Sequence, residues 1–389
     1  MMEKKFTPPT SMLKTFIPIL VVILSFTSCQ QEKTANGPIY KRDYKEAILE
    51  SRKELGAHLM TSFTPGGSVS VSVDGELVWS EGLGYANKEL KAPTQRNTKF
   101  RIGNSSQLFT AYLIAKMQEE NQLHIDSSFY TYIPDFPKKR ADFTLRMLMN
   151  QVAGFPESSN REAQQLDKKI RTLKDYIKLH ENDSLVYQPD SYFLQSNLSL
   201  ALLGILAEDI SQKRFADLIQ ETIIDTLQLN NTQLDNTMAI IENRSNTYDR
   251  DYIARLTNAP QINLNPLAPA LGMLSTADDL NLAAQQLLEP GFFNEETLQL
   301  FYEPYQLSTG QRLNSSFGWL VITDREGRKV IGQAGSTTGG ASAIAVYPEQ
   351  KLVVTLCANL GSDFEDLPVM QIANHFLKII DPKEDAKQE

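Results

Sequence analysis

The stretch FRIGNSSQLFTA, residues 100–111, carries the strongest fold signal in this chain of 389 residues. From Gln107 to Leu123, apolar side chains recur at helical spacing, which predicts a largely buried helix. The four residues from Asn104 to Gln107 also match a capping box, in which an N-cap side chain and a Gln at the third helical position satisfy free amides. A structural role for Asn104 and Gln107 therefore stands beside any functional one.

Strand patterns lie at both ends of the chain, with helical patterns between them. Residues 68–73 alternate serine and valine, turn at Asp74-Gly75 and return through 77–79, which predicts a hairpin. Its valines should be buried, and its serines either exposed or facing another layer. We expect further strands at 317–322, 343–347 and 352–356, and helices at 40–59, 198–210, 277–288 and 367–379. This order predicts an α+β fold with one antiparallel sheet flanked by helices and an all-helical insertion subdomain.

The N-terminus has the features of an export signal. Lysines precede an apolar run, residues 16–26, that is far shorter than the roughly 20 residues needed to span a bilayer. Cys29 follows two small residues directly after this run, which resembles the lipobox of bacterial lipoproteins. We therefore expect Cys29 to be lipidated and to hold the protein on a membrane of a bacterial cell envelope, as a periplasmic or outer-membrane-attached lipoprotein. The alternative is an ordinary secretory signal or N-terminal anchor with an incidental cysteine.

Composition excludes several classes of function. The formal net charge of −9 argues against nucleic-acid binding. Cys357 is the second of two cysteines, so a chain processed at Cys29 has no free pair for an internal disulfide, and Cys357 is best interpreted as a small core residue. The four histidines lack metal-ligand spacing, and we expect neither a metal nor another cofactor.

The predicted organisation is a single domain behind an export signal and a tether. We assign 1–28 to the signal peptide, 29–40 to a polar tether, 41–381 to the domain and 382–389 to a polar tail. Within the domain, the α/β part should comprise about 41–115 and 275–381, and the helical part about 116–274.

Several ordered segments resemble the serine β-lactamase and penicillin-binding protein family, in particular class C β-lactamases. Residues 144–156 resemble the family segment that ends in H-T-S-G-L-P, with Gln151 in place of the histidine. Further matching segments are 202–204, 274–280 and 317–319. The resemblance extends from about residue 66 to 360 and implies a β-lactamase/transpeptidase-like fold.

The same resemblance implies a serine hydrolase site, but the reacting residues of its first motif are replaced. The family motif S-x-x-K supplies a serine nucleophile and a lysine base one helical turn later. Asn104 and Gln107 occupy these positions. Asn104 has no hydroxyl, and the amide nitrogen of Gln107 cannot accept a proton at neutral pH.

The second and third motifs show the same change. In residues 189–197, Gln195 stands where the family has the tyrosine of Y-x-N, and Asn197 is retained. Gln333 stands where the family has the lysine or histidine of K-T-G or H-x-G, and Gly335 is retained. Losing the nucleophile or its base alone costs about 10⁴ to 10⁶ in rate, so these substitutions together predict an inactive enzyme.

The leading hypothesis is therefore a pseudoenzyme whose former active site binds a small ligand, and the resemblance suggests a peptidoglycan-derived or similar peptide. The candidate ligand-binding residues are Asn104, Gln107, Gln195, Asn197, Gln333, Gly335 and Ser336. A second hypothesis is an active hydrolase of the D-Ala-D-Ala peptidase, β-lactamase or esterase type that uses other residues. Its candidate hydroxyl groups belong to Ser105, Ser106, Ser196, Ser336, Tyr187 and Tyr192. A third is a structural envelope protein whose partner binds the outer surface and not the cleft. For the site itself, the alternative to ligand binding is a structural remnant in which Gln195 and Gln333 bond to one another or to Asn104 and seal the cleft.

Overall fold

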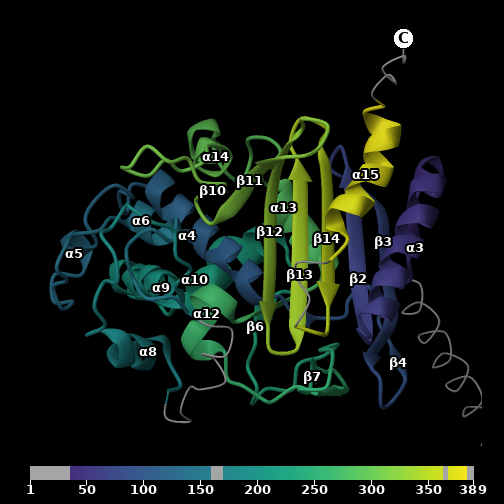
Figure 1. Ribbon diagram of the computed structural model, residues 1–389, viewed down its shortest axis with the longest axis horizontal. Helices are drawn as coiled ribbons and strands as arrows, with labels where there is room; N and C mark the ends of the chain where they lie inside the picture. The colour runs from purple at the N-terminus through teal and green to yellow at the C-terminus, as the bar shows by residue number, and fades with distance from the viewer. Residues whose placement is uncertain (1–35, 159–169, 362–366, 383–389) are drawn as a thin grey trace, which may run out of the picture. The chain divides into compact units, whose positions relative to one another are not determined.

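The computed structural model describes residues 36–158, 170–361 and 367–382 (Figure 1). The predicted signal peptide, Cys29, most of the tether and most of the polar tail lie outside these residues. From Pro38 onward the chain forms one compact unit. The last two residues of the predicted tether, Ile39 and Tyr40, form a short strand (β1) that pairs with Ser80 and Trp79. These two residues of the predicted tether are therefore part of the sheet.

A large antiparallel sheet joins the two ends of the domain. Its strands are β1 (Ile39–Tyr40), β2 (Gly66–Val73), β3 (Glu76–Asn87), β10 (Ser315–Ser316), β11 (Trp319–Thr323), β12 (Lys329–Thr337), β13 (Gly340–Tyr347) and β14 (Leu352–Ala358). Their order is β1-β3-β2-β14-β13-β12-β11-β10, and β4 (Ala92–Pro93) pairs with β3. Strand β14, near the end of the chain, thus pairs with β2, near its beginning, as Figure 1 shows at the centre of the molecule.

The predicted hairpin is β2 and β3, and both faces of β2 are buried. Val69 and Val71 pack into a cluster with helices α3 (Lys45–Thr61) and α15 (Val369–Ile380). Ser70, between them, lies on the opposite face, where α13 (Ala277–Gln285) covers the strand. The serines therefore face another layer of the protein and not solvent.

Helices cover both faces of the sheet. Figure 1 shows α3 and α15 beside the strands of one face and α4 (Gln107–Glu119) and α13 on the other side. Asn281 of α13 donates side-chain hydrogen bonds to the carbonyls of Ser70 and Val353, 3.2 and 3.1 Å away, and so joins α13 to two strands. The final helix has its apolar side on the sheet, with Phe376 fully buried.

The region between the two sheet-forming parts is dominated by helices. They are α5 (Phe129–Tyr132), α6 (Leu145–Met149), α8 (Leu173–His180), α9 (Asn197–Ser211), α10 (Phe215–Ile219), η3 (Gln220–Ile224), α11 (Asp225–Leu227), η4 (Asn265–Leu267), α12 (Ala268–Leu271) and, after α13, α14 (Glu295–Tyr302). The short strands β6 (Gln233–Leu234), β7 (Tyr248–Arg250) and β8 (Leu256–Asn258) also lie there. β9 (Met273–Ser275) pairs with both β6 and β5 (Phe100–Arg101), which connects this region to the segment that precedes α4.

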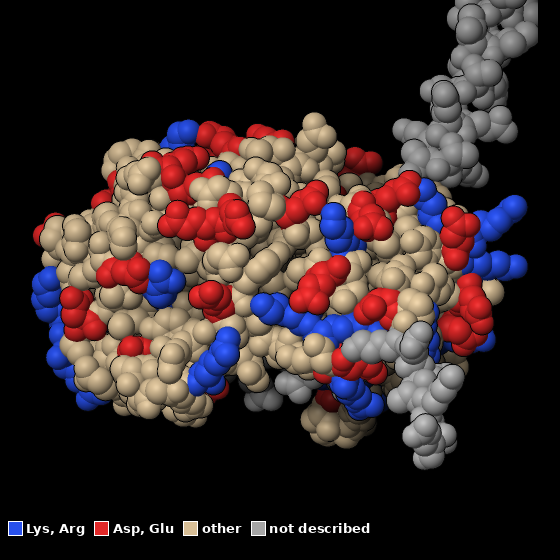
Figure 2. Space-filling view, turned by 90° about the horizontal axis from the view of Figure 1, so that it is seen from above, with Lys and Arg blue, Asp and Glu red and all other residues tan. Residues whose placement is uncertain are grey.

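The surface carries charged side chains of both signs. Acidic and basic side chains are interspersed over the face seen in Figure 2. Within the described part of the chain, no helix is long and apolar enough to cross a membrane.

Candidate ligand site

A tight turn brings the first motif against the sheet. Residues Gly103–Ser106 form a 3₁₀ turn (η2) between β5 and α4, and Gly103 has φ +56°. A side chain at Gly103 would lie 2.3 Å from the Ser336 carbonyl carbon, and one at Gly335 would lie 2.3 Å from the Ser105 backbone nitrogen. Only glycine fits where η2 and β12 approach this closely. The retained Gly335 therefore has a packing role.

The predicted capping box does not form. Asn104 lies inside η2 and not in the extended conformation of an N-cap, and Gln107 is the first residue of α4. The N-cap residue is Ser106, whose side chain makes no capping hydrogen bond. Its hydroxyl instead accepts a 3.1 Å hydrogen bond from the Met273 backbone amide, because β9 lies beside the turn. Capping therefore does not account for Asn104 and Gln107.

The three motifs converge on one small pocket of about 180 Å³. Gln107, Gln195 and Gln333 all line it, together with Gln151, the residue in place of the family histidine. Its remaining lining residues are Met149, Asn150, Phe193, Ser315, Gly318, Trp319, Leu320 and Ala334. The other predicted ligand-binding residues, Asn104, Asn197, Gly335 and Ser336, are not among the lining residues.

Gln333 is held by the backbone beside the pocket. Its side chain is 4% exposed, and its Nε2 donates a 2.6 Å hydrogen bond to the carbonyl oxygen of Gly318. Its Oε1 accepts from the Ala334 amide at 3.2 Å. In the described residues, no hydrogen bond joins Gln333 to Gln195 or Asn104. The network of the structural-remnant alternative is therefore not formed among these residues, and the Gln333 amide instead contacts the backbone of Gly318 and Ala334.

Gln151 positions the second motif. It has φ +62°, and its carbonyl oxygen accepts a 3.0 Å hydrogen bond from the Leu194 amide. Its side-chain Oε1 accepts from the Ser196 amide at 2.8 Å. Gln195 lies between these two contacts, so Gln151 fixes its backbone from both sides. Asn197 is 4% exposed and begins α9. Its backbone amide donates a 2.9 Å hydrogen bond to the Ser158 hydroxyl.

The four serines of the active-hydrolase hypothesis are buried and lack a base. Ser105 accepts a 2.8 Å hydrogen bond from the Ser342 hydroxyl, and the Ser106 hydroxyl accepts one from the Met273 backbone amide. Ser196 and Ser336 are also almost fully buried. Over the described ranges, none of the four hydroxyls is hydrogen-bonded to a histidine, lysine or carboxylate side chain. An activated serine needs such a neighbour.

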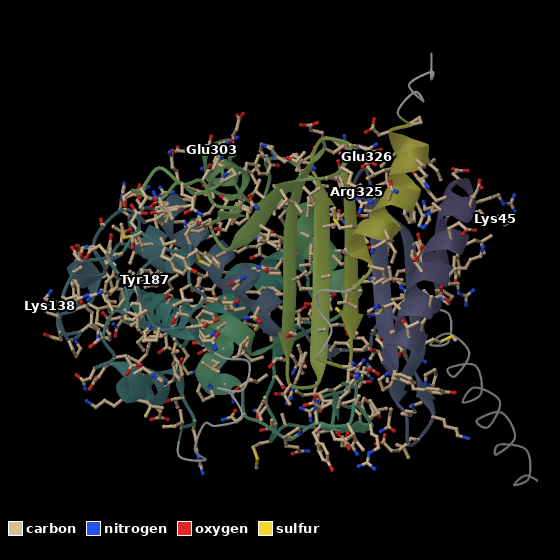
Figure 3. The ribbon with its side chains drawn as sticks, in the orientation of Figure 1. Lys45, Lys138, Tyr187, Glu303, Arg325 and Glu326 are labelled. Carbon is tan, nitrogen blue, oxygen red and sulfur yellow. The ribbon has the colours of Figure 1, made fainter. Side chains whose placement is uncertain are left out.

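The two candidate tyrosines and the remaining thiol also lack the properties of a base or nucleophile. Tyr187, labelled among the helices in Figure 3, has its pKa raised to about 12 by burial. A tyrosine acting as a base needs its pKa shifted the other way. Tyr192 is 60% exposed and packs edge-on against Tyr187, with ring centroids 5.6 Å apart. Cys357 is fully buried, and burial raises the pKa of its thiol far above the usual range.

Several lining residues were not predicted as site residues. Asn150 adjoins Gln151, and Trp319 begins β11; both lie in segments that carry the family resemblance, which was the available signal. The indole Nε1 of Trp319, the Nε2 of Gln151 and the hydroxyl of Ser315 are buried and have no hydrogen-bond partner. An unmet buried donor costs about 1–3 kcal/mol. The walls of this pocket thus hold donors with unused capacity.

The chemical character of the pocket is neutral and partly apolar. None of its lining residues is charged at neutral pH, whereas four are glutamines, and Met149, Phe193, Trp319 and Leu320 provide apolar surface. A pocket of this kind offers hydrogen bonds and apolar contact, but no proton transfer and no ion pair. At about 180 Å³ it is smaller than the roughly 300–1,000 Å³ of typical ligand sites.

Comparisons with known proteins agree with this architecture. A mitochondrial serine beta-lactamase-like protein LACTB from Bos taurus is 25% identical, with 88% of this chain and 81% of that protein covered. The solved octameric penicillin-binding protein homologue from Pyrococcus abyssi is 22% identical, with a TM-score of 0.75 over 87% of this chain and 78% of that one. FmtA from Staphylococcus aureus is 19% identical, with a TM-score of 0.72 over 90% and 94%. The profile of the Beta-lactamase family matches residues 54–375, and the chain therefore belongs to the β-lactamase family.

Proposed function

We propose that this protein is a catalytically inactive member of its family that uses the former active-site pocket to bind a small ligand. One observation carries the proposal: Gln107, Gln195 and Gln333, from three separate motifs, line the same pocket. Acyl transfer needs a nucleophile, a base and donors for the oxyanion. The pocket retains donors, but its lining holds no base, and its one hydroxyl, on Ser315, is buried without a hydrogen-bond partner.

The ligand class follows from the neutral lining. A carboxylate would enter without a cationic partner, and its desolvation would be uncompensated. A neutral amide, in contrast, can accept from and donate to the glutamine side chains while its apolar part contacts Phe193 and Trp319. We therefore favour a peptide-like group over a free carboxylate. The small volume fits one residue of such a ligand, with the remainder outside the pocket.

The unmet donors support binding over a purely structural remnant. Trp319 is 1% exposed, and its indole N–H can only donate. The Nε2 of Gln151 is likewise a donor without an acceptor. Each of these atoms exposes less than 1 Å² to solvent, so a ligand carbonyl would satisfy them only by moving the pocket wall as it binds.

We further propose that the domain acts at a membrane of the cell envelope. Cys29, at the end of the apolar N-terminal run, would carry the acyl chains, and the residues up to Gly37 would separate the membrane from β1. A peptidoglycan-derived peptide is then the proposed ligand. Metabolic labelling with a palmitate analogue tests this part: Cys29→Ala should abolish incorporation, and persistent incorporation would refute lipidation at Cys29.

Two experiments test the proposal for the pocket. Incubation of the domain with a fluorescent penicillin and with a fluorophosphonate probe should leave no covalent adduct, because none of the candidate serine hydroxyls in the described residues has a base beside it. A labelled serine would establish the active-hydrolase alternative. Muropeptides should raise the melting temperature of the wild type by binding the folded state, and Gln195→Ala should reduce that rise.

The matched control for Gln195 is Gln122→Ala, an exposed glutamine outside the pocket that contacts Glu120. It should leave the ligand-induced shift unchanged. If neither a label nor a shift is observed with any muropeptide, the structural-protein alternative replaces the proposed function.

A further inference from the structure

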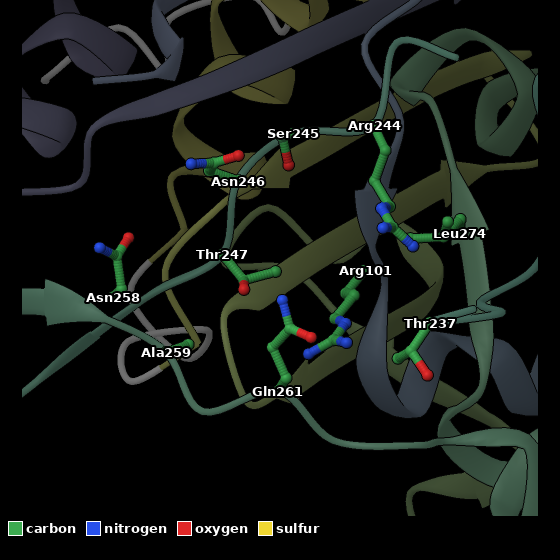
Figure 4. A pocket seen from close by; sticks show the side chains of 10 residues that line it. All are labelled: Arg101, Thr237, Arg244, Ser245, Asn246, Thr247, Asn258, Ala259, Gln261 and Leu274. Atoms are coloured by element: carbon green, nitrogen blue, oxygen red, sulfur yellow. The ribbon is translucent and has the colours of Figure 1, made fainter. Parts of the chain in front are cut away.

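A second pocket, of about 400 Å³, lies apart from the former active site (Figure 4). It is lined by Arg101, Thr237, Arg244, Ser245, Asn246, Thr247, Asn258, Ala259, Gln261 and Leu274. None of these residues lines the pocket formed around Gln107, Gln151, Gln195 and Gln333, which we call the glutamine pocket. Arg101 comes from β5 and Leu274 from β9, Thr237 follows β6, and the other residues lie just before β7, at the end of β8 or just after it.

One buried carboxylate holds both arginines of this pocket. Asp235 is fully buried; its Oδ2 accepts from Arg101 Nε at 2.6 Å, and its Oδ1 accepts from Arg244 Nη1 at 3.3 Å. Arg101 Nη1 also donates to the Thr338 carbonyl at 3.0 Å, and Arg244 Nη1 to that of Asn236 at 3.2 Å. The guanidinium groups are therefore fixed before any ligand arrives, which lowers the entropic cost of binding.

The carboxylate of Asp235 neutralises only one of the two guanidinium groups. No acidic residue is among the lining residues. Glu89 lies outside that set, but its carboxylate accepts hydrogen bonds from the Tyr248 hydroxyl at 2.6 Å and from the side chains of the lining residues Asn246 and Asn258. Figure 4 shows Arg101, Arg244 and Thr237 together on one side of the pocket and Asn258 on the other. One positive charge is thus unbalanced on the arginine side, within a chain of net charge −9.

The rest of the lining is polar and uncharged. Six side chains provide hydroxyl or amide groups, and only Ala259 and Leu274 are apolar. Arg244 is only partly buried, with 31% of its side chain exposed, so its guanidinium can be reached from solvent. Guanidinium groups recognise carboxylates through paired hydrogen bonds. Neutral hydroxyls and amides beside them suit a ligand rich in hydroxyl groups and not an apolar one.

We propose that this pocket binds a small polyhydroxylated carboxylate, a molecule of the sugar-acid class. Its carboxylate contacts Arg244 on the arginine side, and its hydroxyls bond to the neutral polar side chains. The affinity depends on the charge of Arg244 and on the polar lining, and not on the glutamine pocket.

Calorimetric titration of the purified protein tests this with four probes: glucuronate, glucose, acetate and inorganic phosphate. Glucuronate should bind, glucose should not because it lacks the charge, and acetate and phosphate should bind more weakly because they lack the hydroxylated ring. Arg244→Gln should weaken glucuronate binding about ten- to hundredfold, the range for a lost charged hydrogen bond. Thr237→Val keeps the charge but should also weaken binding, by up to about tenfold.

Two controls test whether the effects are specific to this pocket. Arg214→Gln removes a guanidinium that is 78% exposed and pairs with Asp217, and should leave glucuronate binding unchanged. Gln195→Ala should also leave it unchanged, because that residue lines the other pocket. The proposal is overturned if glucuronate does not bind, if glucose or phosphate binds as well as glucuronate, or if Arg244→Gln in a folded protein binds it normally.

Discussion

The side-chain amide of Gln333 donates a 2.6 Å hydrogen bond to the carbonyl oxygen of Gly318. This contact joins β12 to the residue just before β11, at the position where the family resemblance implies a lysine or histidine. The position that would supply a cation or an imidazole therefore stabilises the wall of the pocket. A glutamine at this position also brings no charge to the pocket.

Restoring the four motif residues should restore some chemistry. The variant Asn104→Ser, Gln107→Lys, Gln195→Tyr and Gln333→His should fold and hydrolyse p-nitrophenyl acetate at least about tenfold faster than the wild type, since each missing group costs orders of magnitude in rate. Mass spectrometry should locate a fluorophosphonate adduct at position 104. The control carries Asn104→Ala with the other three changes and should stay inert. A folded but inactive quadruple variant would show that the frame has diverged beyond these positions.

Gln151→Ala should destabilise the protein by about 1–3 kcal/mol in guanidinium denaturation. The substitution removes the acceptor for the buried Ser196 amide and leaves that amide unpaired. It should also lower ligand binding in the glutamine pocket, because Gln195 loses its support. Gln122→Ala, at an exposed position, should change the free energy of unfolding by less than about 0.5 kcal/mol. Equal stability of both variants would contradict the proposed role of Gln151.

Gly335→Ala should destabilise the protein by about 1–3 kcal/mol or more, because the added methyl group meets the backbone of η2 at Ser105. The matched control is Gly56→Ala in α3, where the added group has nothing within 4 Å. That change should raise the free energy of unfolding by about 0.5–1 kcal/mol through helix propensity. Thermal and chemical denaturation of both variants measure the contrast. An unaffected Gly335→Ala protein would mean that η2 and β12 are farther apart than described.

Burial of Tyr187 should make stability fall at alkaline pH. Its ordinary pKa is 10.0 and its folded pKa is about 12. Above pH 10 the unfolded state therefore releases the phenolic proton while the folded state keeps it. The free energy of unfolding falls between pH 10 and 12 as a result. Tyr187→Phe should show a shallower decline than the wild type over this interval in denaturation series. The same decline in both proteins would refute the shift.

Much of the fold was predictable because the spacing of apolar residues along the chain indicates which side of a strand or helix is buried. The alternation of residues 68–73 predicted β2, and the helical spacing after Gln107 predicted α4, although that helix ends at Glu119 and not at Leu123. The boundaries were less accurate because capping and turns depend on neighbours. The first long helix, for example, begins at Lys45 because residues 39–44 are used in β1 and a 3₁₀ turn.

The candidate site was predictable only in part. Motif resemblance identified Gln107, Gln195 and Gln333, and the structure places all three around one pocket. It also suggested Asn104, Asn197, Gly335 and Ser336, which lie outside the lining. The pocket lined by Arg101 and Arg244 could not be predicted from the sequence, because these residues are separated by 143 positions and meet only at Asp235.

The sequence by itself determined the family, the order of strands and helices and the identity of the side chains at the three motif positions, because local periodicity and residue type are properties of the chain. Tertiary structure alone decided what those side chains contact. Asn104 to Gln107 matches a capping box, but β9 and β12 pack against this turn. The Ser106 hydroxyl accepts a hydrogen bond from the Met273 amide, and no side-chain cap forms at the start of α4. Such choices depend on which distant strand lies nearest, and that is settled only when the whole sheet assembles.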